Sequence, residues 1–133
     1  MKPIQTLLCM AIVVFGICGA QRCAAETAEE MLSACRPIMA AKVADGKINL
    51  PTDFESGNCW GAFGAIQDLF SAINATTKKP MFGVCMPESI TRTQIIAIFV
   101  RYTEKHPEKY NERVVWVTEA AIREVFPCPA SKL

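Results

Sequence analysis

Histidine is nearly absent from this sequence, which restricts the catalytic chemistry that the chain can support. The only histidine is His106, directly before Pro107 in a segment expected to form a turn. A serine or cysteine nucleophile needs a neighbouring base, and that base is usually a histidine. A polar residue in a turn is usually a solvent-exposed surface residue. The sequence therefore argues against an enzyme.

Closely spaced metal-ligand pairs are also missing. The cysteines at positions 35, 59, 85 and 128 are widely separated, whereas zinc sites usually take their ligands in close pairs. Glycines occur at positions 57, 61 and 64, but no buried strand precedes them and no lysine follows in the place that a phosphate-binding loop requires. We therefore expect neither a metal ion nor a cofactor.

The chain carries little net charge, formally +1 at neutral pH. Basic and acidic residues are mixed along it, so no segment has the excess of positive charge that binds nucleic acid or an anionic membrane. We expect neither of these two partners.

The main apolar run is at the N-terminus, over residues 4–18, after the single basic residue Lys2. Small residues follow it. A basic start, a short apolar stretch and then small residues are typical of a secretory signal peptide, and the run is shorter than a membrane-spanning helix. Cleavage after Ala20 or after Ala25 satisfies the small-x-small rule, and an uncleaved membrane anchor is the alternative.

The cysteine content favours cleavage after Ala25. Seven cysteines are present, and this cut leaves four of them, an even set that can pair completely. The cut also removes two basic residues and no acidic one, so the net charge changes from +1 to −1. The sequence thus predicts a signal peptide over residues 1–25 and a domain over residues 26–133 that is exported to an oxidising compartment.

Four helical segments are expected in the exported domain. Their ranges are 27–39, 56–74, 91–105 and 107–127. The first and third begin with capping boxes, formed by Thr27 with Glu30 and by Thr91 with Gln94. Apolar residues recur at helical spacing along the segments. The predicted fold is a small all-α domain of four helices.

The second helical segment contains a stripe of small residues. Gly57, Gly61 and Ala65 are four residues apart and share one helix face. Glycine costs up to about 1 kcal/mol per position in a helix interior. We therefore expect the stripe to mark close packing by another helix or an irregular helix start.

A short turn joins the last two segments, which predicts an antiparallel helical hairpin. Cys85 comes just before the third segment and Cys128 just after the fourth, so the hairpin would bring both to the same end. We predict that these two are bonded, and that Cys35 and Cys59 form the second disulfide. Four cysteines allow three pairings, and the sequence leaves them open.

Two polar segments are candidates for binding a partner, the expected loop at residues 74–80 and the turn between the last two helices. The candidate residues are Thr76, Thr77, Lys78 and Lys79 in the loop, and Lys105, His106, Glu108 and Lys109 in the turn.

Residues 45–56 are expected to form another connecting loop. Trp60 is expected to pack in the core beside a disulfide, and an exposed anchor for a partner is the alternative.

Three segments resemble the Rap/Tai immunity proteins, which are associated with type VI secretion amidase effectors. They are SGNCWGAFGAIQDLF at residues 56–70, GVCMPESITRTQIIAIFVRYTEKHPEKY at residues 83–110 and FPC at residues 126–128. The resemblance covers most of the exported domain, and its motifs are together fairly specific.

The resemblance implies a periplasmic, all-helical protein that binds a peptidoglycan-cleaving amidase delivered by a competitor and blocks its active-site cleft. Proteins of this kind are often dimers, so a homodimer is also expected. No catalytic residue carries over, because these proteins have none. The cysteines at positions 59, 85 and 128 match as structural positions.

Two other functions compete with this interpretation. The first is a small periplasmic stress protein or chaperone that would expose an apolar face at low pH. The second is a carrier of small ligands, but such carriers use cysteines in close or adjacent pairs, which this chain lacks.

Overall fold

The computed structural model describes residues 26–41, 43–44, 47–77 and 80–129. Within these ranges it has four α-helices, namely α2 (Ala28–Met39), α3 (Phe54–Thr77), α4 (Arg92–Lys105) and α5 (Val114–Val125). Two 3-10 turns, η1 (Met81–Gly83) and η2 (Pro107–Lys109), and a small hairpin of β1 (Val43–Ala44) and β2 (Lys47–Ile48) connect them. The four helices confirm the expected all-α class. The expected signal peptide lies outside the described residues.

Both predicted capping boxes are present. The Thr27 hydroxyl accepts a hydrogen bond from the Glu30 amide, and the Glu30 carboxylate accepts one from the Thr27 amide at 2.8 Å. The Thr27 amide, and then the Thr27 hydroxyl at 2.9 Å, donate hydrogen bonds to the Glu30 carboxylate and hold the pKa of Glu30 below its ordinary value. Thr91 and Gln94 form the same reciprocal pair at the start of α4. The starts of α2 and α4 therefore follow directly from local sequence.

Helix α3 is longer at both ends than the sequence indicated. The Asp53 carboxylate accepts hydrogen bonds from the Ser56 amide at 2.8 Å and from its hydroxyl at 2.9 Å, which lowers the pKa of Asp53 and caps the helix at Phe54. At the other end the helix continues to Thr77, and the Thr76 hydroxyl donates to the Ala72 carbonyl at 2.8 Å. The expected loops are therefore wrong over residues 54–55 and 75–77, and β2 also lies inside the first of them.

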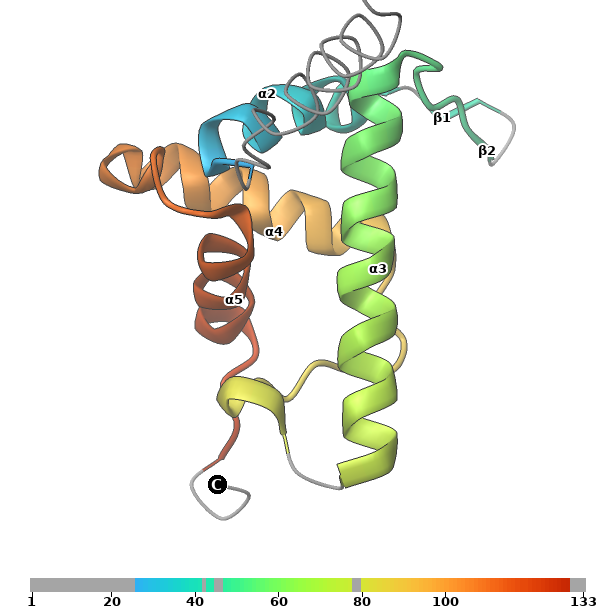
Figure 1. The fold of residues 1–133 in the computed structure, drawn as a ribbon. Helices are drawn as coiled ribbons and strands as arrows, with labels where there is room; N and C mark the ends of the chain where they lie inside the picture. The colour runs from blue at the N-terminus through green and yellow to red at the C-terminus, as the bar shows by residue number, and fades with distance from the viewer. Residues whose placement is uncertain (1–25, 42, 45–46, 78–79, 130–133) are drawn as a thin grey trace, which may run out of the picture.

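The core forms where α2 crosses α3 and α4, and α4 in turn packs against α5 (Figure 1). Phe63 of α3 and Phe99 of α4 are fully buried, with their ring centroids 5.1 Å apart. Around them lie the other large buried side chains, which include Met31, Leu32, Ile95, Ile96, Val117 and Ile122. Each helix thus contributes one apolar face to a single core.

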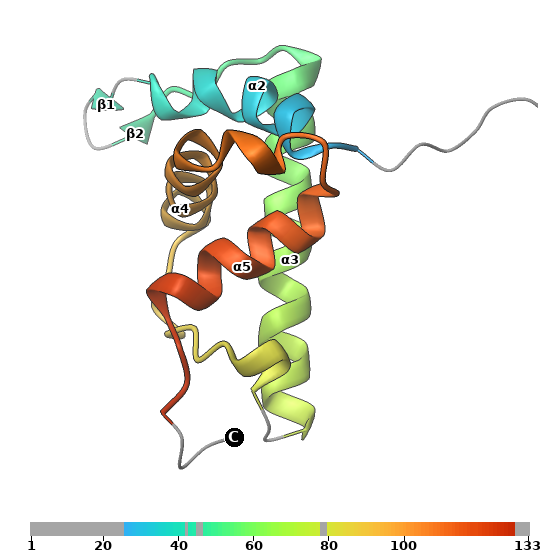
Figure 2. The same ribbon diagram turned by 90° about the vertical axis from the view of Figure 1, so that its left-hand side faces the viewer.

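The predicted antiparallel hairpin of the last two helices is wrong. Figure 2 shows α4 nearly end-on while α5 runs across the view, so the two helices cross. The expected helix start at Pro107 is also wrong, because η2 is a separate turn and α5 begins only at Val114. Between them the chain is held against α2, where the amides of Ala28 and Glu29 donate to the carbonyls of Glu112 and Tyr110 at 2.8 Å and 3.1 Å.

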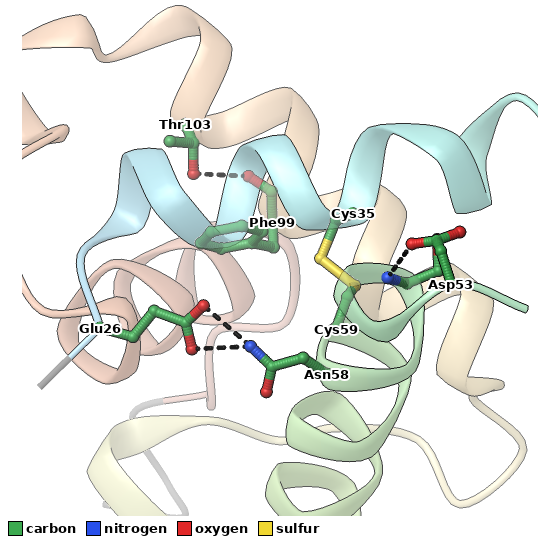
Figure 3. Close-up of a disulfide and its surroundings, with 8 residues drawn as sticks. Glu26, Cys35, Asp53, Asn58, Cys59, Phe99 and Thr103 are labelled. Atoms are coloured by element: carbon green, nitrogen blue, oxygen red, sulfur yellow. Dashed lines mark hydrogen bonds between the residues drawn. A yellow bond between two sulfur atoms is a disulfide. The ribbon is translucent and has the colours of Figure 1, made fainter. Parts of the chain in front are cut away.

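Two disulfides join elements that are distant in sequence. Cys35–Cys59 connects α2 to α3, with Cα atoms 5.3 Å apart (Figure 3). Cys85–Cys128 connects the segment before α4 to the segment after α5, with Cα atoms 4.9 Å apart. Backbone hydrogen bonds from the Cys85 amide to the Phe126 carbonyl and from the Cys128 amide to the Gly83 carbonyl, both at 2.9 Å, flank the second bridge. These are the two pairs expected from the sequence.

Among the described residues, no other helix packs against the small-residue stripe of α3. A Cβ atom built on Gly57 or Gly61 meets nothing within 4 Å, and Ala65 is exposed. The crowded glycine is Gly64, where a Cβ would lie 2.6 Å from the guanidinium carbon of Arg92. The Arg92 guanidinium lies 4.7 Å from the ring centroid of Trp60, which packs partly against the core. The expectation of close helix packing on the stripe is therefore wrong.

Removing either disulfide should destabilise the domain strongly. The bridges span sequence separations of 24 and 43 residues, so restricting the unfolded chain contributes about 3 to 4 kcal/mol for each bridge. We expect C35A/C59A and C85A/C128A to lower the free energy of unfolding by that amount in urea denaturation. Wild-type protein treated with dithiothreitol is the control. A double variant that unfolds at the wild-type midpoint would contradict this account.

Replacing an exposed glycine of α3 should have the opposite effect and stabilise the domain. Because Gly61 is exposed within α3 and a Cβ there meets no atom, Gly61→Ala should raise the free energy of unfolding by about 0.5 to 1 kcal/mol. Gly64→Ala is the matched control, since its Cβ must displace Arg92. Urea denaturation should rank Gly61→Ala as the more stable variant, and the reverse order would overturn the interpretation.

Candidate functional site

A groove runs between α4 and α5 on the surface of the domain. It consists of two hollows of about 360 Å³ and 210 Å³ that share Ile98, Arg101 and Val125. The larger hollow is also lined by Pro87, Ser89, Ile90, Gln94, Ala97 and Phe126, and the smaller one by Tyr102, Lys105, Ala121 and Glu124. Because α5 crosses α4, its C-terminal turn forms one wall of the groove and α4 forms the floor.

The groove combines two cations and the carboxylate of Glu124 with apolar surface. Arg101 and Lys105 are exposed, and neither forms an ion pair with another described residue. The Arg101 Nε donates to the Ala97 carbonyl of its own helix at 3.2 Å, which orients the guanidinium along α4. Val125 is 47% exposed and supplies apolar surface beside these cations. The arrangement suits a protein segment that carries a carboxylate next to an apolar side chain.

The turn at the end of α4 is held by its own side chains. The rings of Tyr102 and His106 are in contact, tilted by 34° with centroids 4.3 Å apart, and the His106 Nδ1 is 2.8 Å from Glu108 Oε1. A hydrogen bond to its own backbone amide, and then the one to His106, hold the pKa of Glu108 below its ordinary value. The Lys109 Nζ donates to Glu112 at 3.2 Å, which raises the pKa of Lys109. The turn is thus ordered before any partner binds.

The structure separates the two predicted sets of binding residues. Lys105 lines the groove, His106 follows it as the N-cap of η2, and Glu108 and Lys109 lie within η2. Of the other set, Thr76 and Thr77 lie at the C-terminal end of α3, far from η2 in both ribbon views (Figures 1 and 2). There Thr76 is exposed and Thr77 is the last helical residue, while Lys78 and Lys79 lie outside the described residues. Thr76 and Thr77 are therefore separated in the fold from the candidate residues of the turn.

Apart from Lys105, the sequence did not identify the residues that form the groove as binding candidates. Arg101, Gln94 and Ser89 are polar positions outside the buried stripe of α4, which is a signal for exposure but not for a groove. Val125 falls on the apolar face predicted for the last helical segment, yet the crossing of α5 over α4 leaves it half exposed. The crossing depends on contacts with α2, which no local pattern encodes.

Two further properties limit the chemistry of the described residues. They contain no group of three or more histidine, cysteine, aspartate or glutamate side chains placed to hold a metal ion. None of their helices is both long and apolar enough to span a membrane.

The family model of the Rap1a immunity proteins matches residues 27–128. This protein belongs to the Rap1a immunity protein family. The match confirms the resemblance found in the sequence and spans all four helices and both disulfides. No curated protein and no solved structure matches the chain. As an immunity protein, it has a toxin protein as its partner.

In this Rap1a-family protein, the hydrogen bonds of Glu108 predict how the stability of the turn depends on pH. Since the folded-state pKa of Glu108 is lowered, the stabilisation by its ionised form is present at neutral pH and is lost as the pH falls through that pKa. His106→Ala should raise the pKa of Glu108 part of the way to its ordinary value, because the backbone hydrogen bond remains. Carboxyl-detected NMR titration measures this shift. Lys109→Ala should change it less, and an equal change would contradict the assignment.

Proposed function

We propose that this protein is a periplasmic immunity protein that binds a peptidoglycan amidase toxin delivered by type VI secretion and blocks its active-site cleft. The family match supports the immunity role. The two disulfides support an oxidising compartment. Inhibition is by stoichiometric binding and requires no catalysis by the immunity protein.

The single observation that carries the binding mode is the continuity of the groove with the ordered turn. Lys105 belongs to both, since it lines the groove and is the last residue of α4 before His106. Internal hydrogen bonds already fix the turn, so little conformational entropy is lost when it enters a cleft. The turn would occupy the amidase cleft while Arg101 and Lys105 pair with carboxylates at its rim.

The alternative function, a stress protein or chaperone, has less support. The support for a chaperone is the small helical domain and the expected export. Both are equally expected of an immunity protein. The family match distinguishes the two and favours immunity.

Titration against the toxin tests this proposal. The exported domain is mixed with the amidase effector encoded by the neighbouring gene, and peptidoglycan cleavage should stop near equimolar ratio. Static light scattering of the same complex measures its stoichiometry and tests the expected homodimer. Full cleavage in the presence of excess immunity protein would refute the proposal.

A pair of charge variants locates the contact. We expect R101Q/K105Q to weaken binding of the amidase about tenfold, because the carboxylates at the rim of its cleft lose their cationic partners. R36Q/R123Q is the matched control, since it removes two cations that are paired with Glu104 and Glu119 outside the groove. Isothermal titration calorimetry measures both. Equal affinities of the two double variants would place the contact elsewhere.

A further inference from the structure

A second groove lies between α2 and α3, and its lining shares no residue with the α4–α5 groove. Its α2 wall adjoins the segment after η2, where the Glu29 amide donates to the Tyr110 carbonyl at 3.1 Å. The groove consists of two adjoining hollows of about 570 Å³ and 450 Å³ that share Phe54 and Asn58. One hollow is also lined by Glu26, Glu29, Glu30, Ser33, Ala34 and Glu55, and the other by Gly57, Gly61 and Ala62. None of these residues belongs to the surface assigned to the toxin.

The walls of this α2–α3 groove are fixed. The Cys35–Cys59 disulfide joins α2 to α3, and the Asn58 side-chain amide donates to the Glu26 carboxylate at 3.0 Å and 3.2 Å (Figure 3). These two links hold the helices in one relative position. A binding surface that is fixed in advance loses little entropy when a partner binds.

The first half of the groove is acidic. Four carboxylates line it, and its lining contains no lysine or arginine. Glu26 and Glu30 have partners in Asn58 and Thr27. Glu29 and Glu55 are exposed and form no ion pair with another described residue. This half therefore attracts a cation.

The second half of the groove is apolar and flat. Phe54 is 87% exposed, so burial against the described residues does not account for an aromatic residue at this position. Beyond it, Gly57 and Gly61 leave the α3 backbone open, because a Cβ added at either position would meet nothing within 4 Å. Each glycine lowers the stability of the helix by about 1 kcal/mol relative to alanine, and no described residue uses the space. A flat helix surface next to an exposed aromatic side chain is suited to a second helix that approaches closely.

We propose that the α2–α3 groove binds a helical segment of a partner protein that carries lysine or arginine over the carboxylates and small or aliphatic residues over the glycines. The negative charge of the acidic half favours a basic partner segment. A second copy of the same groove would place carboxylates against carboxylates and is disfavoured. Recognition follows the helix-in-groove mode, with Phe54 as the apolar anchor and Glu29 and Glu55 as the charge partners.

A synthetic peptide tests the proposal without any amidase, so the result is independent of the proposed function. The probe is an amphipathic helical peptide of about 18 residues, with lysines towards one end and alanine and leucine on one face. Added to the isotope-labelled exported domain, it should shift the NMR amide signals of Glu29, Gly57 and Gly61. The shifts should weaken between about 0.05 M and 0.5 M salt. A peptide with glutamate in place of lysine should leave these signals unchanged.

Matched variants identify the surface. Gly61→Leu fills the apolar half, and E29K/E55K reverses the free charges of the acidic half, so each should weaken peptide binding at least about tenfold. Ala72→Leu and Asp68→Lys, at exposed positions of α3 outside the groove lining, should bind as the wild type does. The proposal is overturned if the lysine peptide shifts none of the three signals, if the glutamate peptide binds equally well, or if groove variants and controls bind alike.

Discussion

The first turn of α2 presents backbone amides that its own helix cannot satisfy, and the rest of the fold depends on how they are satisfied. The carbonyls of Glu112 and Tyr110 accept hydrogen bonds from the amides of Ala28 and Glu29, and the Val114 amide donates to the Glu26 carbonyl at 3.1 Å. These bonds join the first described helix to the segment before the last one. They turn the chain away from α4 after η2, so α5 crosses α4 instead of lying alongside it. The α4–α5 groove is a consequence of that crossing.

The two disulfides fix different parts of this arrangement. Cys35–Cys59 lies within the core region, where Cys35 and Cys59 are both fully buried, and it holds α2 against α3. Cys85–Cys128 lies nearer the surface and joins η1 to the end of α5, beside two backbone hydrogen bonds. A domain of this size buries a limited apolar core, so covalent links at both places contribute a large share of its stability. They also keep the walls of the surface grooves in place.

The parts of the fold that the sequence predicted are those encoded by neighbouring residues. The capping boxes of Thr27 and Thr91 need only the residues three positions later, and both are present. The sequence also suggested the two cysteine pairs, although the hairpin used to argue for one of them is absent. Helix crossing, by contrast, results from contacts between residues that are distant in sequence. For that reason Lys105 was identified as a candidate from its turn, whereas Arg101 and Val125, which share its groove, were not.

The net charge of the chain gives no indication of how charge is distributed over its surface. The formal charge of the whole chain is +1, and composition alone indicated no charged patch. The fold distributes the charges unevenly: Arg101 and Lys105, with one carboxylate (Glu124), line the α4–α5 groove, whereas the acidic half of the α2–α3 groove is lined by four carboxylates and by no lysine or arginine. Opposite charges on separate surfaces cancel in the sum but not in the local field that a partner meets. A protein that must recognise its toxin specifically gains more from such local fields than from overall charge, because complementary charge at each contact also excludes wrong partners.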